Sequence, residues 1–250
     1  MEKTKLKGMV FAALFAALTG AVAWFKIPLP FTPVPITLQT LLVLMSGAML
    51  GPYYGALAMI IYLILGAIGL PVFAGGSSGI GSLFGPTGGY LFSYPVAAFF
   101  IGIILKKNNL NKFMKYFSFV VVLIFVAIVG LDSALKIGIM KLGKDTMISV
   151  LTGQQRTILI IVSFAVMVGL LLLVYYTKKS KYFSIDTVLA MFAGTLIIYI
   201  MGSIQGKFVT GLSWSAIFVG WVLPFIVGDT LKLLVAAWIS NKIKIKKYMK

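Results

Sequence analysis

The run Met9-Val-Phe-Ala-Ala-Leu-Phe-Ala-Ala-Leu-Thr-Gly-Ala-Val-Ala-Trp-Phe25 is 17 residues long and carries no charge. A helix of that length can cross the hydrocarbon core of a bilayer. Across the chain 60% of residues are hydrophobic and only 11% are charged, whereas soluble domains carry about 25% charged residues. We therefore predict an all-α, polytopic membrane helix bundle in a single domain. Its eight spans would be 9–25 and the further apolar runs 37–50, 54–70, 88–105, 117–131, 157–176, 187–205 and 224–241.

The distribution of basic residues predicts the orientation of these spans. Lys and Arg number 22 against 5 Asp and Glu, a net charge of +17. These charges lie between the apolar runs, which is typical of topology signals and not of a nucleic-acid-binding surface. With a cytoplasmic N-terminus, 15 basic residues fall inside and 6 outside. We therefore expect a protein of the cell membrane with both termini cytoplasmic and no nucleic-acid partner. The first run has no A-x-A cleavage pattern ahead of a mature soluble domain, so we interpret it as a retained helix and not a signal peptide.

Two predicted external segments are unusual. The segment Ile27-Pro-Leu-Pro-Phe-Thr-Pro-Val-Pro35 holds four prolines in nine residues. Because proline fixes φ and lacks an N–H donor, this segment is predicted to be stiff, extended and non-helical. The segment 69–89 is rich in glycine, which lets backbone approach backbone or ligand closely. It lacks the Lys-Ser/Thr of a phosphate-binding loop and the βαβ context of a dinucleotide site, so nucleotide binding is excluded.

An acidic residue lies inside the last apolar run, in Leu223-Pro-Phe-Ile-Val-Gly-Asp-Thr-Leu-Lys232. Ionisable residues at membrane depth are costly and usually face the interior with a partner. Asp229 and Lys232 are three residues apart and so share one helix face. One interpretation is a structural pair in which Asp229 caps the helix. The favoured interpretation is a polar clamp for a small ligand, because a cap gives no reason to bury Lys232 one turn deeper.

Ala12, Ala16 and Gly20 recur every four residues in the first helix and form a smooth stripe. Such stripes allow close helix approach, either within this bundle or to a separate membrane subunit. The spacing alone favours neither interpretation.

Catalysis has little support. The chain has no His and no Cys, no paired carboxylates, and no Ser beside a plausible base. We expect no enzyme activity, no metal site and no cofactor. The chain also has no ATP-binding motif.

Several motifs together resemble the BioY family, the substrate-binding S components of energy-coupling-factor (ECF) biotin transporters. They are, in the family's order, Ile27-Pro-Leu-Pro-Phe-Thr-Pro-Val-Pro-Ile-Thr-Leu-Gln-Thr40, Leu50-Gly-Pro52, Gly66-Ala-Ile-Gly-Leu-Pro-Val-Phe-Ala-Gly-Gly76, Leu83-Phe-Gly-Pro-Thr-Gly-Gly-Tyr90 and Leu223–Lys232. The resemblance covers about 1–105 and 187–250. It implies six family helices, so that about 106–186 would be an inserted helical hairpin.

The resemblance implies that this chain captures biotin from outside and works with an ECF coupling transmembrane subunit and two ATP-binding subunits. It implies that Asp229 and Lys232 contact biotin, that the Ala12, Ala16 and Gly20 stripe docks the coupling subunit, and that Ser77 stands where members can use Asn. Leu91 stands where some members have Arg, which removes one candidate partner for the biotin carboxylate. That carboxylate would then be bound by Lys232, by Lys26, or by backbone N–H groups and water. The other predicted site residues are Phe31, Gln39, Phe73, Gly76 and Tyr90.

The main alternative is a self-sufficient secondary transporter for another small carboxylate solute. It would need an ion-coupling residue at mid-membrane, and Asp229 is the only acidic candidate in an apolar run. A membrane enzyme ranks third.

Overall fold

A computed structural model describes residues 2–30, 32–106, 184–212 and 214–243 and the single positions 169, 245 and 248. Helix α1 (Glu2–Ala23) leads into strands β1 (Lys26–Leu29) and β2 (Thr32–Thr37), then α2 (Gln39–Ala67), a 3₁₀ turn η1 (Ala74–Gly76), α3 (Ile80–Phe84) and α4 (Gly88–Lys106). The second described part comprises α8 (Ile185–Thr210), α9 (Trp214–Ile217), a π-helical turn η2 (Phe218–Val222), a 3₁₀ turn η3 (Leu223–Phe225) and α10 (Ile226–Lys242).

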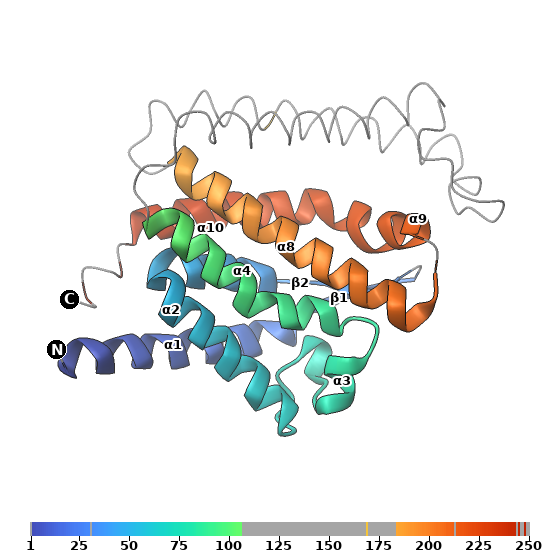
Figure 1. The fold of residues 1–250 in the computed structure, drawn as a ribbon, viewed down its shortest axis with the longest axis horizontal. Helices are drawn as coiled ribbons and strands as arrows, with labels where there is room; N and C mark the ends of the chain where they lie inside the picture. Colours follow the sequence, from blue (N-terminus) through green and yellow to red (C-terminus); the bar gives the residue numbers. More distant parts are fainter. Residues whose placement is uncertain are drawn as a thin grey trace.

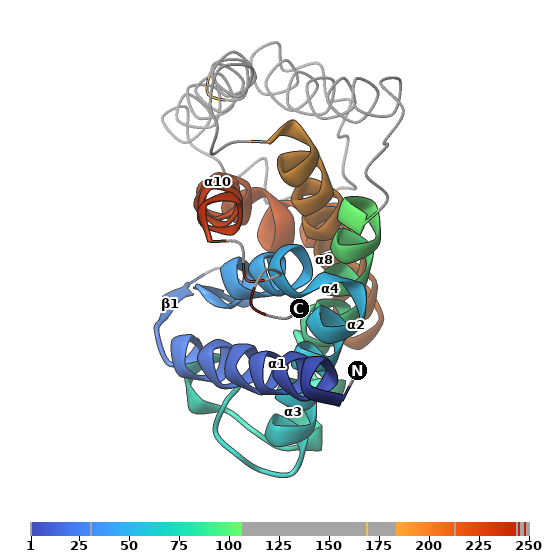
Figure 2. The same cartoon turned by 90° about the vertical axis from the view of Figure 1, so that its left-hand side faces the viewer.

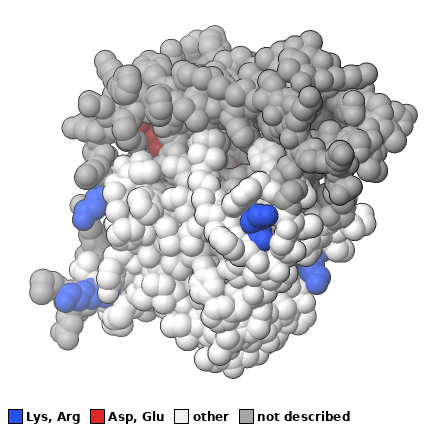
Figure 3. Space-filling view, turned by 45° about the vertical axis from the view of Figure 1, so that its right-hand side comes forward, with Lys and Arg blue, Asp and Glu red and all other residues white. Residues whose placement is uncertain are grey.

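The helices pack side by side as a bundle (Figure 1). Five helices in the described part are long and apolar enough to cross a membrane: Thr4–Ala23, Gln39–Ala67, Gly88–Lys106, Ile185–Thr210 and Gly220–Lys242. The described surface in Figure 3 is mostly uncharged, with a few separated Lys and Arg side chains. The prediction of a polytopic helical membrane bundle is therefore confirmed. The predicted spans 117–131 and 157–176 lie outside the described residues, so the count of eight remains a prediction.

Helix α2 is folded back on itself at Gly51. The backbone there has φ 82° and ψ −174°, a region open essentially only to glycine. Gln39 and Tyr62 are 23 residues apart yet share a side-chain hydrogen bond, which a straight helix would prevent because 23 residues span about 35 Å. A Cβ on Gly55 would lie 2.8 Å from the carbonyl oxygen of Ser46. The two arms are therefore antiparallel neighbours, as the separate runs 37–50 and 54–70 predicted (Figure 1).

The proline-rich segment forms a two-stranded antiparallel sheet, so the all-α prediction is wrong at this point. Lys26 pairs with Thr37 and Ile27 with Ile36. Pro33 and Pro35 are two residues apart, so their missing donors fall on the same side of β2. A two-stranded sheet has a free edge on every strand, where absent N–H groups cost no ladder bond. Extended, non-helical backbone was predicted correctly, but its pairing was not.

Glycines set how closely the central helices approach one another. A Cβ on Gly47 of α2 would lie 2.5 Å from the carbonyl oxygen of Ala98 in α4. A Cβ on Gly102 of α4 would overlap the backbone of Pro52. Close backbone packing of this kind holds helices together where lipid supplies no hydrophobic driving force. The arms of α2 are thereby fixed against α4.

The stripe of Ala12, Ala16 and Gly20 faces the bundle interior. Ala12 and Ala16 are 0% and 1% exposed, α1 packs mainly against α2, and a Cβ on Gly20 would lie 3.0 Å from Val72. The prediction that this stripe docks a separate subunit is wrong, because its small side chains already serve packing within the chain.

The first residues of α1 and the last residues of α10 lie at the same end of the bundle (Figure 1). The turn after α2, α3 and the end of α8 lie at the opposite end, and Figure 2 shows α1 at the edge of the bundle. If the bundle spans a membrane, the start of α1 and the end of α10 therefore lie on one side of it.

Candidate ligand-binding site

An irregular stretch of helix places the acidic residue of the last span. Pro224 has no N–H to donate, and the chain passes through the π turn η2 and the 3₁₀ turn η3 before α10 begins. The carbonyl oxygen of Trp221 in this stretch accepts a hydrogen bond of 2.7 Å from the Tyr90 hydroxyl. The Tyr90 side chain of α4 thus forms a hydrogen bond with the backbone of this irregular stretch. Asp229 follows in the first turn of α10.

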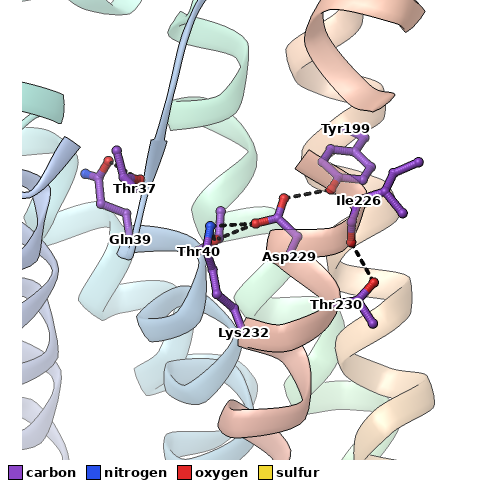
Figure 4. A network of polar contacts seen from close by, with 8 residues as sticks. All are labelled: Thr37, Gln39, Thr40, Tyr199, Ile226, Asp229, Thr230 and Lys232. Atoms are coloured by element: carbon purple, nitrogen blue, oxygen red, sulfur yellow. Dashed lines mark hydrogen bonds and ion pairs between the residues drawn. The ribbon is translucent and has the colours of Figure 1, made fainter. Parts of the chain in front are cut away.

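Asp229 is the centre of a polar cluster drawn from three helices (Figure 4). Lys232 Nζ donates to Asp229 Oδ1 at 2.7 Å, and Thr40 Oγ1 donates to the same oxygen at 3.2 Å. Tyr199 of α8 donates its hydroxyl to Asp229 Oδ2 at 2.7 Å. Lys232 Nζ also donates to Thr40 Oγ1 at 3.3 Å. Both charges are thus held by hydrogen bonds as well as by each other, which their burial requires.

The alternative that Asp229 caps the helix does not fit this geometry. The residue before α10 is Phe225, and it makes no side-chain capping bond. The carboxylate oxygens of Asp229 instead accept from the side chains of other helices and of Lys232. Asp229 and Lys232 therefore form a buried polar pair, as the spacing predicted.

A second polar group lies beside the first, at the start of α2 (Figure 4). Gln39 is 2% exposed. Its Nε2 donates to the hydroxyl of Tyr62 on the returning arm, and its Oε1 accepts from Thr37 Oγ1 at 3.2 Å. The fold-back of α2 therefore fixes the orientation of the Gln39 amide.

Side chains of both polar groups line one partly open cavity, whose empty space of about 660 Å³ includes solvent at its opening. Six of the predicted site residues line it: Gln39, Phe73, Ser77, Tyr90, Asp229 and Lys232. Apolar and aromatic side chains make up much of the remaining wall, including Val34, Leu91, Tyr94, Ile198 and Phe225. An apolar wall with a few convergent polar groups is typical of a site for a small organic molecule.

Gly76 and Phe31 are the two remaining predicted site residues. Gly76 does not line the cavity; a Cβ there would lie 3.2 Å from the ring of Trp24, so the space at this glycine is used by the chain itself and not by a ligand. Phe31 lies outside the described residues.

The sequence did not single out Thr40, Tyr199 or Tyr94. Thr40 ends the proline-rich motif, so its position next to Gln39 was a usable signal. Tyr199 and Tyr94 lie within apolar runs, where one tyrosine among many aromatic residues carries no local signal. Only the packing of α8 and α4 around α10 brings their side chains to the cavity.

The glycine-rich segment forms the rim of the cavity. Phe73 and Ser77 pair across the turn that contains η1, and Ser77 Oγ donates to the carbonyl oxygen of Ala74 at 3.2 Å. Gln205 of α8 donates its Nε2 to the carbonyl oxygens of Leu83 and Gly85, at 2.7 and 2.8 Å. The rim is thus tied to the bundle.

A family model described as the BioY family matches residues 1–162 and 160–248, nearly the whole chain. The chain belongs to the BioY family. The resemblance of its motifs is therefore confirmed.

Among BioY family relatives, the "Probable biotin transporter BioY" of Pyrococcus horikoshii is 48% identical over 99 residues, covering 40% of this chain and 60% of the relative. The "Biotin transporter BioY" of Thermotoga maritima is 47% identical over 104 residues, covering 42% and 60%. That of Lactococcus lactis subsp. cremoris is 34% identical over 129 residues, covering 51% and 68%. The matched stretch thus spans about 60% of the length of the first two relatives.

A solved structure has the same fold as this BioY family chain. It is described as the "S-component for biotin from an ECF-type ABC transporter" and superposes with a TM-score of 0.62 at 22% identity, covering 99% of this chain and 94% of that one. At 22% identity, this match shows that the two chains share a fold.

Proposed function

We propose that this chain is the biotin-binding S component of an ECF-type importer and is not an enzyme. The observation that carries the proposal is the cluster of Asp229, Lys232, Thr40 and Tyr199 on the wall of an otherwise largely apolar cavity. The family membership of the chain and the names of its relatives as biotin transporters support the choice of ligand.

The cavity offers complementary groups to each part of biotin. The ureido ring has N–H donors and one carbonyl acceptor, which match a carboxylate such as Asp229 and an ammonium such as Lys232. The sulfur-containing ring and its methylene chain are apolar and suit the aromatic wall around Phe73 and Tyr94. Because Asp229 and Lys232 form an ion pair with each other, both side chains are already oriented before the ligand binds.

An ECF-type importer uses ATP hydrolysis, and the given sequence has no ATP-binding motif, so in this proposal partners on other chains hydrolyse the ATP and couple it to transport. We assign these roles to an ECF coupling transmembrane subunit and two ATP-binding subunits. The exposed face of α1 is a candidate for docking them. Ala13 and Ala17 are exposed there, four residues apart, beside the buried stripe.

We also propose that the cavity opens to the outside of the cell membrane and that both termini are cytoplasmic. The distribution of 15 basic residues inside and 6 outside supports this orientation. The placement of the start of α1 and the end of α10 at the end opposite the glycine-rich rim agrees with it (Figure 1).

Titration calorimetry of the purified chain in nanodiscs tests the proposal. Biotin is expected to bind one-to-one with roughly nanomolar affinity, equivalent to about −12 kcal/mol. An absence of binding to biotin, with clear binding of another vitamin or small carboxylate, would reject the assignment and favour a different transported solute.

A further inference from the structure

We infer that Lys26 binds the carboxylate of the ligand at the rim of the cavity. The ring system of the ligand then points towards Asp229 and its acid group towards the outside. This inference rests on the proposed function and adds to it the residue that selects an acid over a neutral analogue.

The charge inside the cavity is already balanced. Lys232 lies 2.7 Å from the carboxylate of Asp229, and both side chains are about nine-tenths buried. The pair has no net charge, and a ligand carboxylate brought to Lys232 would also face the negative charge of Asp229. Like charges at such short range repel strongly in a buried site. The acid group of the ligand therefore needs a different cation.

Lys26 lies at the rim of the same cavity by two independent measures. It begins β1 and pairs with Thr37 of β2, and Thr37 lines the cavity. Its side chain also lies against Gly75, where an added Cβ would overlap its ammonium end. Ala74 and Ser77, on either side of that turn, line the cavity too.

The turn at Gly75 makes room for this lysine. Gly75 has φ 69° and Gly76 has φ 77°, and both conformations favour glycine. The absence of a side chain at Gly75 lets the Lys26 chain lie across the turn, with Trp24 across Gly76. The sheet and the turn thus hold the ammonium group beside the opening.

The ammonium group of Lys26 is available to a ligand. The residue is exposed, and the ion pair formed within the described residues is that of Asp229 and Lys232. Biotin carries its ureido and carboxylate groups at opposite ends of an elongated molecule. A ring held near Asp229 leaves the carboxylate free to reach the rim, where the Lys26 side chain lies against the turn at Gly75.

The test compares biotin with biotinamide, in which a neutral amide replaces the carboxylate, on wild-type protein and on Lys26→Met in nanodiscs. We expect Lys26→Met to weaken biotin about fivefold, the upper end for an exposed ion pair, and to leave the affinity for biotinamide unchanged. The affinity for biotin should also fall with added salt in the wild type and less so in the variant. Lys26→Arg should keep the preference for the acid.

Lys207→Met is the matched control. It removes one lysine charge from the outer end of α8, where Nζ donates to the carbonyl oxygen of Leu212, and it should leave both affinities unchanged. An equal loss for biotin and biotinamide in Lys26→Met, or no loss for either, would overturn the inference while the proposed function stands. Wild-type protein that binds neither compound would overturn the proposed function itself.

Discussion

Asp229 and Lys232 have 8% and 11% of their side chains exposed, so both charges have lost most of their contact with solvent. Removing an ion from water costs several kcal/mol, and well-packed apolar residues can often replace a buried pair without loss of stability. Stability alone therefore gives a weak reason for the pair. Its position on the wall of a cavity, with Thr40 and Tyr199 orienting the carboxylate, gives a better reason, which is recognition of a polar ligand.

Single and double variants separate these two roles. Asp229→Asn and Lys232→Met should each lower the free energy of unfolding by about 3–5 kcal/mol, because each leaves one buried charge without its partner. The double variant should recover much of that stability, because no charge remains unpaired. Biotin binding should be lost in all three. Thermal unfolding and calorimetry give the two readouts, and a double variant that binds biotin like the wild type would show that the pair is only structural.

Helix α1 presents two different faces. Ala12, Ala16 and Gly20 pack inward against α2 and the segment that follows it. Ala13 and Ala17, one position further along, lie on the exposed face together with large apolar residues such as Leu14 and Leu18, which are 49% and 41% exposed. A face of small residues among leucines allows the backbone of another helix to approach closely.

Ala17→Trp tests the docking role of the exposed face. The indole ring would keep a coupling subunit at a distance, so biotin uptake in cells and co-purification of the coupling subunit should be lost. Biotin affinity of the isolated chain should stay unchanged, because the cavity lies among other elements. Ala16→Trp is the contrast on the buried face: with 1% exposure at this position, a large ring should destabilise the bundle and impair binding as well. Normal uptake with Ala17→Trp would mean that this face contacts only lipid.

At the scale of the whole molecule, the bundle has two unlike ends. One end holds the start of α1, the end of α4 and the end of α10 (Figure 1). The other holds the sheet and the glycine-rich rim beside the cavity, with Lys26 and Lys207. A membrane across the bundle would place these ends on opposite sides, so that ligand capture and the termini are separated by the bilayer.

Cysteine labelling tests the orientation, and the chain contains no native cysteine that would interfere. A cysteine at Lys207 should react with a membrane-impermeant maleimide on intact cells, whereas one at Lys106 should react only after permeabilisation. In the eight-span arrangement, a cysteine at Lys144 should also react from outside and one at Lys179 should not. Reversed labelling of Lys106 and Lys207 would place the cavity on the cytoplasmic side.

Composition and spacing alone determined several properties of this protein. The apolar runs predicted a membrane helix bundle, four closely spaced prolines predicted extended backbone, and the i, i+3 spacing predicted that Asp229 and Lys232 share a face. Each of these depends on local geometry or on total hydrophobicity, which the chain carries without reference to its neighbours.

Only the tertiary structure decided which faces meet. The reversal at Gly51 joins Gln39 to Tyr62, and the packing of α2 and α8 on α10 brings Thr40 and Tyr199 to Asp229 across 189 and 30 residues of sequence. In a soluble helix the apolar face marks the core, but in a membrane the lipid-facing side is as apolar as the protein-facing side. The pattern of hydrophobic residues therefore could not tell the buried Ala16 from the exposed Ala17, and helix packing made that distinction.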